Sequence, residues 1–294
     1  YKAMDNILKL SEDGKTVIGV NDKSVTCITI PKGVANIGDC AFLGCTALQS
    51  IYVPKNVKKI GSEAFCSCSA LKDIHIEDSD EILSIGYDSS VGLFCFCPLE
   101  TLYIGRNLSY SFHSPFCNIN TLKDITISNY VTTINNRAFK GCSALKSINI
   151  PNSVTTIGDY AFEGCSTLSC INMPSSVMSI GSCAFKSCSA LESINIPNGV
   201  RKIGCMAFIC CSSLQSIGIP YSVTNIEGNA FYNCYSLTSI VVDKKNSVYD
   251  SREGCNAIIN TKSNELITGC KSTIIPNSVT TIGDGAFYDC SSLQ

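Results

Sequence analysis

The sequence contains no tryptophan and only two histidines, His75 and His113. It also lacks the glycine-rich phosphate loop of nucleotide-binding proteins and the strained serine turn of many hydrolases. With so few imidazoles and no such motif, no set of acid, base and nucleophile can be assembled. We therefore expect a protein that is not an enzyme and that carries no cofactor.

Charged side chains are scarce. They make up 16% of the 294 residues, against about 25% in an average soluble domain, and the formal net charge is -2. Serine, threonine and asparagine provide the polar surface instead. Because no basic face is available to attract phosphate backbones or anionic lipid, nucleic acid is not an expected partner.

Long apolar runs are also missing. No stretch approaches the roughly 18 residues of a membrane-spanning helix, so we expect no membrane insertion by this segment. The chain begins at Tyr1 without an initiator methionine or a signal peptide, and its last repeat stops at Gln294. We interpret it as a mature or trimmed segment.

What the sequence does contain is a repeat of 23 residues. The stretch 145–167, LKSINIPNSVTTIGDYAFEGCST, follows the skeleton L-x-x-I-x-I-P-x-x-V-x-x-I-G-x-x-A-F-x-x-C-x-x. A fixed period of this size predicts a solenoid, in which each repeat forms one rung that stacks on the next. The repeated aromatic residue occurs in successive rungs as Phe139, Phe162, Phe185, Phe208 and Phe231.

Each rung is expected to begin with a strand. Ile148 and Ile150 alternate with polar residues, which predicts a short strand with one face in the core and one toward solvent. Pro151 helps to end the strand, and Gly158 lies where a corner is expected to need a permissive backbone. Residues 159–165 have room for a turn or two of helix before the chain returns.

These repeats, with their IPxxVxxIGxxAFxxC run, resemble the BspA-like leucine-rich repeats over almost the whole chain. The resemblance implies an α/β repeat solenoid: a right-handed superhelix with a parallel sheet of short strands on the concave face and short helical or irregular outer segments. It also implies a bacterial protein that is secreted or held at the cell surface, with an export signal upstream of this segment. Members of the family are associated with attachment to host matrix proteins such as fibronectin and fibrinogen.

We expect a single solenoid domain over residues 1–294. The dipeptide Asp13-Gly14 is a strong hairpin signal, and a hairpin there would cover the exposed core of the first rung. Residues 77–127 are irregular: one rung has five extra residues, and the next replaces the repeat pattern with RNLSYSFHSPF. The expected parts are a hairpin cap with the first strand (1–30), the repeats (31–242), a repeat with an inserted hairpin (243–275) and a partial C-terminal repeat (276–294).

Nearly half of the 20 cysteines follow the repeat. Nine of them lie three residues after the aromatic position, which we interpret as a ladder of small buried thiols. Stacked side chains point the same way at a spacing of about 4.8 Å, which does not suit a disulfide. These ladder cysteines are Cys45, Cys68, Cys97, Cys142, Cys165, Cys188, Cys211, Cys234 and Cys290.

Two pairs look like zinc half-sites, Cys66-x-Cys68 and Cys95-x-Cys97. One cysteine of each pair belongs to the ladder, and a zinc site needs two more convergent ligands, so we expect no metal. The acidic cluster around Asp78 lacks the ligand spacing of a calcium loop and is interpreted as a solvated bulge.

Cys255 and Cys270 are the one pair with a geometric case for a disulfide. If the inserted hairpin turns at Lys262-Ser263, Ile259 lies opposite Leu266 and the two cysteines lie opposite each other. A disulfide is one interpretation, and two more buried thiols are the other.

The candidate binding surface is the concave face. Its outward strand position holds Tyr52, His75 and Tyr103 on consecutive rungs, and such amphipathic rings are favoured binding anchors. The alternative is that they only cover the sheet. Thr126 continues the row, Asp73 and Asp124 lie two residues earlier on their strands, and a secondary candidate surface is formed by Tyr110, Phe112 and His113.

Three functions agree with this surface. The first is binding of a host matrix or surface protein. The second is binding of a glycan, because sugars stack on tyrosine rings. The third is a spacer or scaffold for another domain, with no ligand of its own.

Overall fold

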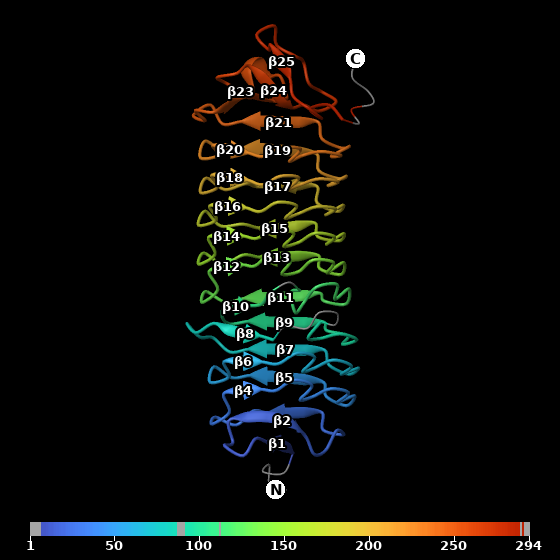
Figure 1. The fold of residues 1–294 in the computed structure, drawn as a ribbon. Helices are drawn as coiled ribbons and strands as arrows, with labels where there is room; N and C mark the ends of the chain where they lie inside the picture. Colours follow the sequence, from blue (N-terminus) through green and yellow to red (C-terminus); the bar gives the residue numbers. More distant parts are fainter. Residues whose placement is uncertain (1–6, 87–91, 112, 289, 291–294) are drawn as a thin grey trace. The chain divides into compact units, whose positions relative to one another are not determined.

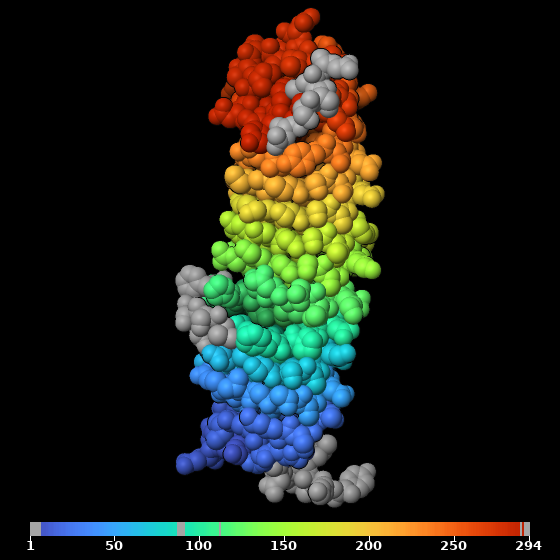
Figure 2. All heavy atoms as spheres, turned by 90° about the vertical axis from the view of Figure 1, so that its right-hand side faces the viewer, coloured from blue at the N-terminus to red at the C-terminus, as the bar shows by residue number. Residues whose placement is uncertain are grey.

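The computed structural model describes residues 7–86, 92–111, 113–288 and 290. Its chain contacts divide it into two compact units at Thr132 and Thr133, and each unit is described by itself. The expectation of one continuous solenoid therefore stays a prediction. Within each unit the rungs stack as successive layers of chain, seen as ribbons in Figure 1 and as bands of side chains in Figure 2.

Each regular rung contains two strands. In the rung that starts at Leu145, β13 (Ser147–Asn149) is the predicted strand, and β14 (Thr156–Ile157) is a second, short one that the sequence analysis did not anticipate. Both pair in parallel with the next rung, Ile148 with Ile171 and Ile157 with Ile180. The fold is a β-solenoid of stacked parallel strands.

The first unit contains two sheets. Their strands are β1 (Leu8–Leu10), β2 (Thr16–Val20), β3 (Cys27–Thr29), β4 (Asn36–Ile37), β5 (Ser50–Val53), β6 (Lys59–Ile60), β7 (Asp73–Ile76), β8 (Leu83–Ile85), β9 (Thr101–Ile104), β10 (Leu108–Ser109) and β11 (Asp124–Ile127). One sheet has the order β1-β2-β4-β6-β8-β10 and the other β11-β9-β7-β5-β3. Only β1 and β2 pair antiparallel in this unit, at the hairpin expected near Asp13-Gly14.

The second unit repeats the pattern. Its further elements are β12 (Thr133–Ile134), β15 (Cys170–Asn172), β16 (Ser179–Ile180), β17 (Ser193–Ile194), β18 (Lys202–Ile203), β19 (Ser216–Ile219), β20 (Asn225–Ile226), β21 (Ser239–Val242), β22 (Tyr249–Asp250), the single helical turn η2 (Arg252–Gly254), β23 (Ile258–Asn260), β24 (Glu265–Thr268) and β25 (Thr281–Ile282). The sheets are β12-β14-β16-β18-β20, β13-β15, β17-β19-β21 and β22-β23-β24-β25.

The predicted helical outer segment is wrong. Residues 159–165 form turns, and η2 is the only helix among the described residues. Two residues of this segment, Tyr160 (φ 57°) and Gly164 (φ 74°), adopt left-handed torsions that an α-helix cannot contain. The backbone N–H of Phe162 donates to the carbonyl of Ala184 in the next rung, at 2.8 Å, so bonds between rungs replace bonds within a helix.

The corner glycine is needed for a different reason from the one expected. Gly158 does not have a positive φ, so a permissive torsion is not what it supplies. A Cβ placed on Gly158 would lie 2.6 Å from the backbone nitrogen of Asn136 in the adjacent rung, and one on Gly181 would lie 2.5 Å from that of Asp159. Close stacking of the corners therefore leaves no room for a side chain at Gly158 or Gly181.

Phenylalanine rings form the centre of both cores. In the first unit Phe42 and Phe65 stack with centroids 5.0 Å apart, and Phe94 and Phe116 with centroids 5.6 Å apart. Phe116 comes from RNLSYSFHSPF, where the repeat pattern is lost, yet it is buried and continues the stack. The irregular rung therefore keeps its place in the core.

The inserted hairpin has the expected register at its centre, where β23 and β24 pair Ile259 with Leu266. A bulge between Ile258 and Ile259 then shifts the pairing. Cys255 and Cys270 are separate, buried thiols in the structure, and the Cys270 Sγ lies 3.4 Å from the carbonyl oxygen of Asn256.

The ladder thiols are hydrogen-bond donors as well as small core side chains. The Sγ of Cys165 donates to the carbonyl of Phe139, in the preceding rung, at 3.2 Å. The same carbonyl also accepts from the backbone N–H of Cys142 at 3.1 Å, so the thiol adds a hydrogen bond between rungs to one made within the turn. The same contact is made by Cys68 to Phe42, Cys97 to Phe65, Cys188 to Phe162, Cys211 to Phe185 and Cys234 to Phe208.

Burial should also make Cys165 and Cys234 unreactive. It raises the pKa of Cys165 and of Cys234 to about 12, and the thiolate is the form that reacts with alkylating reagents. Cys27 and Cys170 are exposed on the outward faces of β3 and β15. We expect iodoacetamide at pH 8 to label those two in the folded protein and to label Cys165 only after denaturation, as read by peptide mass spectrometry. Equal labelling of Cys165 and Cys170 in the folded state would contradict this.

Candidate functional site

The outward face of the sheet β11-β9-β7-β5-β3 carries two rows of side chains in register. One row is Cys27, Ser50, Asp73, Thr101 and Asp124, and the other is Thr29, Tyr52, His75, Tyr103 and Thr126. Neighbours within a row lie on adjacent strands, about 4.8 Å apart. The alternation of inward isoleucines and outward polar residues puts both rows on the solvent side, so all six predicted concave-face residues lie on one surface.

The three aromatic side chains of the second row form a stack. The rings of Tyr52 and His75 have centroids 4.9 Å apart and planes 16° apart, and those of His75 and Tyr103 have centroids 4.3 Å apart and planes 2° apart. Tyr52 remains 45% exposed. Each ring therefore holds its neighbour in place while its edge stays open to solvent.

The two rows line a groove of about 540 Å³, which we call the aromatic groove. This volume falls in the range of about 300 to 1,000 Å³ that is usual for ligand sites. Its lining includes Tyr52, Asp73, His75, Tyr103, Asp124 and Thr126, all six of the residues chosen from the sequence.

Carboxylates lie at the end of the stack. The hydroxyl of Tyr103 donates to Asp78 Oδ1 at 2.9 Å. Burial and this hydrogen bond raise the pKa of Tyr103, and burial together with the Glu77 carboxylate raises the pKa of Tyr52. Both phenols therefore stay protonated at physiological pH. Asp78 is thus more than the solvated bulge expected from the sequence, because it fixes the ring of Tyr103.

Arg106 and Gly105 in the irregular region support the groove from behind. The guanidinium of Arg106 is buried, and its Nη1 donates to the carbonyl of Val57 at 2.9 Å while its Nη2 donates to that of Pro54 at 2.9 Å. These carbonyls form the corner that follows β5. Gly105 lies so close to the backbone of Glu77 and Asp78 that a Cβ there would come within 2.5 Å of it.

The secondary candidate surface is not assembled in the described structure. His113 is exposed, whereas the side chain of Tyr110 is largely buried, and burial raises the pKa of its hydroxyl to about 12. Phe112 lies outside the described residues. Of the two described members of this group, His113 is the more exposed.

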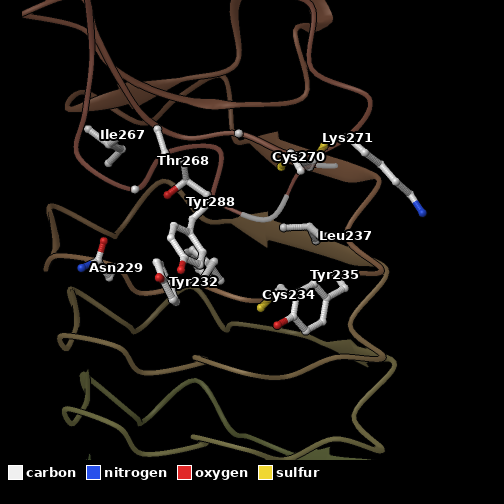
Figure 3. Close-up of a pocket in the computed structure, with 15 residues that line it drawn as sticks. Asn229, Tyr232, Cys234, Tyr235, Leu237, Ile267, Thr268, Cys270, Lys271 and Tyr288 are labelled. Carbon is white, nitrogen blue, oxygen red and sulfur yellow. The ribbon is translucent and has the colours of Figure 1, made fainter. Parts of the chain in front are cut away.

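A second cavity, of about 210 Å³, lies in the second unit between the last regular rung and the inserted hairpin. Figure 3 shows Tyr232 and Tyr288 side by side in its wall, with centroids 4.2 Å apart, and Lys271 pointing away. It is smaller than a usual ligand site, and its lining contains no carboxylate or histidine. The hairpin that replaces a regular rung leaves this space.

The described ranges contain neither a cluster of metal ligands nor a membrane-spanning helix. No three His, Cys, Asp or Glu side chains among the described residues converge as ligands would. The described part of the chain also has no helix of the length and hydrophobicity required to span a bilayer.

Comparison with known families agrees with the repeated, stacked rungs. The model of the BspA type leucine rich repeat region matches residues 20–145, 89–169, 132–257 and 257–294, in six copies. The chain belongs to this BspA-type family. Proteins built from such repeats are generally not enzymes, in keeping with the sparse acid–base chemistry of this chain. A search of curated proteins finds no match.

One solved structure agrees with the fold of this BspA-type protein. A leucine-rich repeat protein from Bacteroides ovatus is 28% identical, has a TM-score of 0.68, and matches over 97% of this chain and 72% of its own. A leucine rich cell surface protein from Faecalibacterium prausnitzii is 24% identical with a TM-score of 0.38, over 98% of this chain and 91% of its own. The pneumococcal vaccine antigen PcpA is 18% identical with a TM-score of 0.41, over 95% of this chain and 78% of its own. At these low TM-scores the last two support no inference about this chain.

Proposed function

We propose that the chain is a non-enzymatic binding module, secreted or displayed on a bacterial cell surface, that attaches to a host matrix or surface protein through the aromatic groove. The observation that carries the proposal is the exposed stack of Tyr52, His75 and Tyr103. A parallel row of rings with polar tips offers a large rigid contact area at low entropic cost.

The stack is not required by the fold. The same outward strand position holds Asn149, Asn172, Gly218 and Val241 in the second unit, where the rungs pair in the same register. Stacking of the rungs depends on the inward isoleucines and phenylalanines, which are buried in both units. The aromatic stack lies in a groove and is not needed for the rungs to stack. This favours a role in ligand binding over a role in covering the sheet.

The groove is also prepared for binding. Tyr103 is held by Asp78, and His75 is held between two rings, so few rotamers remain to be lost when a ligand binds. Each side chain that is fixed before the ligand arrives lowers the entropic cost of binding by about 0.5 to 1.5 kcal/mol.

The test is binding to immobilised fibronectin, fibrinogen, other matrix proteins and glycans. We expect one protein to bind, and we expect the triple variant Tyr52→Ala, His75→Ala, Tyr103→Ala to lose at least tenfold in affinity, about 1.4 kcal/mol. The matched control is Asn149→Ala, Asn172→Ala, Asn195→Ala, which changes three residues in the equivalent position of the repeat in the second unit. Circular dichroism establishes that both variants are folded.

Each other outcome has a meaning. Unchanged binding by the aromatic variant would refute the groove as the site. Selective binding of a glycan would mean that the ligand is a glycan and not a protein. If no probe binds the intact chain, the spacer or scaffold function becomes the better account.

A further inference from the structure

The two ends of the aromatic stack differ. The outer face of Tyr52 is turned toward Thr29 and that of Tyr103 toward Thr126, because these pairs are neighbours in the strand register. Both threonines are short and exposed. Two residues before Thr126 on the same face lies Asp124, whereas the residue two before Thr29 is Cys27. Only the Tyr103 end has an open ring face, a low floor and, two residues before that floor on the same strand, a carboxylate.

We call this place the Thr126 recess: Tyr103 forms its wall, Thr126 its floor and Asp124 its side. Residues two apart on a strand are about 6.6 Å apart, and adjacent strands about 4.8 Å. A planar group that lies on the ring of Tyr103 above Thr126 is therefore within reach of the Asp124 carboxylate. These dimensions fit one flat cationic group.

The charges around the recess are one-sided. The groove lining contains Asp73 and Asp124 but no lysine or arginine. The nearest lysines in sequence, Lys72 and Lys123, are both paired with Glu100, at 3.0 Å and 3.1 Å. Among the described residues the carboxylate of Asp124 has no hydrogen-bond or ion-pair partner, whereas Asp73 accepts a hydrogen bond from Thr101.

We propose that the Thr126 recess binds an arginine side chain of the protein ligand. This inference rests on the proposed function and specifies its partner as a cationic segment of a protein. A guanidinium stacks on an aromatic face and pairs with a carboxylate through two parallel N–H groups, which a lysine ammonium cannot do. The negative charges of Asp73 and Asp124 also repel anionic glycans and nucleic acid.

The first test uses a defined probe, the peptide acetyl-Gly-Arg-Gly-amide, titrated into the whole chain and followed by NMR of the Thr126 methyl group. Its matched control is the same peptide with citrulline, which keeps the shape of arginine and removes the charge. We expect the arginine peptide to shift the Thr126 signal with at least tenfold higher affinity than the citrulline peptide. Equal affinity of the two peptides, or no shift with either, would overturn the inference.

The second test uses variants of the protein. Asp124→Asn is expected to weaken the arginine peptide at least fivefold, and Tyr103→Ala by a similar factor. Asp284→Asn removes an exposed carboxylate in the second unit and is expected to change nothing. If Asp124→Asn binds the peptide as the unmodified chain does, the recess does not recognise the cation.

Failure of the inference is distinguishable from failure of the proposed function. The matrix-protein array is repeated with Asp124→Asn beside the triple aromatic variant. If the aromatic variant loses the ligand and Asp124→Asn retains it fully, the groove is the site but its ligand is not held by an arginine. If neither loses it, the groove itself is not the site.

Discussion

Arg106→Met is expected to destabilise the first unit by at least about 3 kcal/mol, because it removes three hydrogen bonds that a buried guanidinium donates. The guanidinium is 0% exposed, and it donates to the carbonyls of Pro54, Lys55 and Val57 at 2.9, 3.2 and 2.9 Å. Hydrogen bonds from a charged donor are each worth about 1.5 to 3 kcal/mol, and methionine fills similar space without replacing them. The free energy of urea unfolding, followed by circular dichroism, measures the loss.

Two further variants make this prediction specific. Arg106→Lys keeps the charge but not the planar fork, so it should fall between the native chain and Arg106→Met. Arg201→Met changes an exposed arginine and should stay within about 0.5 kcal/mol of the native chain. Hydrogen exchange should quicken first at the corner 54–57. Equal stability of Arg106→Met and Arg201→Met would mean that the buried guanidinium does not stabilise this corner.

The irregular region therefore supports the site. Arg106 fixes the corner after β5, which carries Tyr52, and Asp78 fixes Tyr103. Both residues come from the two rungs, 77–127, where the repeat pattern is lost. Loss of the pattern at these positions coincides with the aromatic groove, so we interpret the departure from the repeat as an adaptation of the site rather than decay of the repeat.

The repeat made the first strand of each rung and the outward face of the groove predictable from the sequence. Alternation of isoleucine with polar residues placed Tyr52, His75 and Tyr103 on one face, because a parallel register adds no shift between rungs. The second strand of each rung was missed, since two residues such as Thr156 and Ile157 are too few for an alternation signal.

Other features had no signal in the sequence. A buried arginine is rare, so Arg106 is read from sequence as a surface residue. The hydrogen bond of Asp78 to Tyr103 joins two rungs across a long insertion, and no local pattern encodes it. The helical interpretation of 159–165 failed because bonds between rungs, with left-handed torsions at Tyr160 and Gly164, outweighed local helix preference.

Phe162→Ala is expected to cost about 3 to 5 kcal/mol of the stability of the second unit. The ring is fully buried and lies between Phe139 and Phe185, with centroids 5.6 Å and 5.3 Å away. Its removal opens a cavity that the rungs cannot close, because the backbone N–H of Phe162 is bonded to Ala184 and holds the spacing. Both neighbouring rings lose a stacking partner at the same time.

The size of the stability loss in Phe162→Ala and the rungs in which it is felt both test whether stability comes from contacts between neighbouring rungs. Phe162→Leu, which leaves a smaller cavity, should cost clearly less than Phe162→Ala, and Tyr221→Ala, at a ring that is 47% exposed, should cost less than about 1 kcal/mol. Because each rung contacts only its neighbours, hydrogen exchange should rise most in the rungs of Phe139, Phe162 and Phe185 and less at Phe231. Uniform acceleration across the second unit would contradict nearest-neighbour coupling and would mean that the unit opens as a single cooperative block.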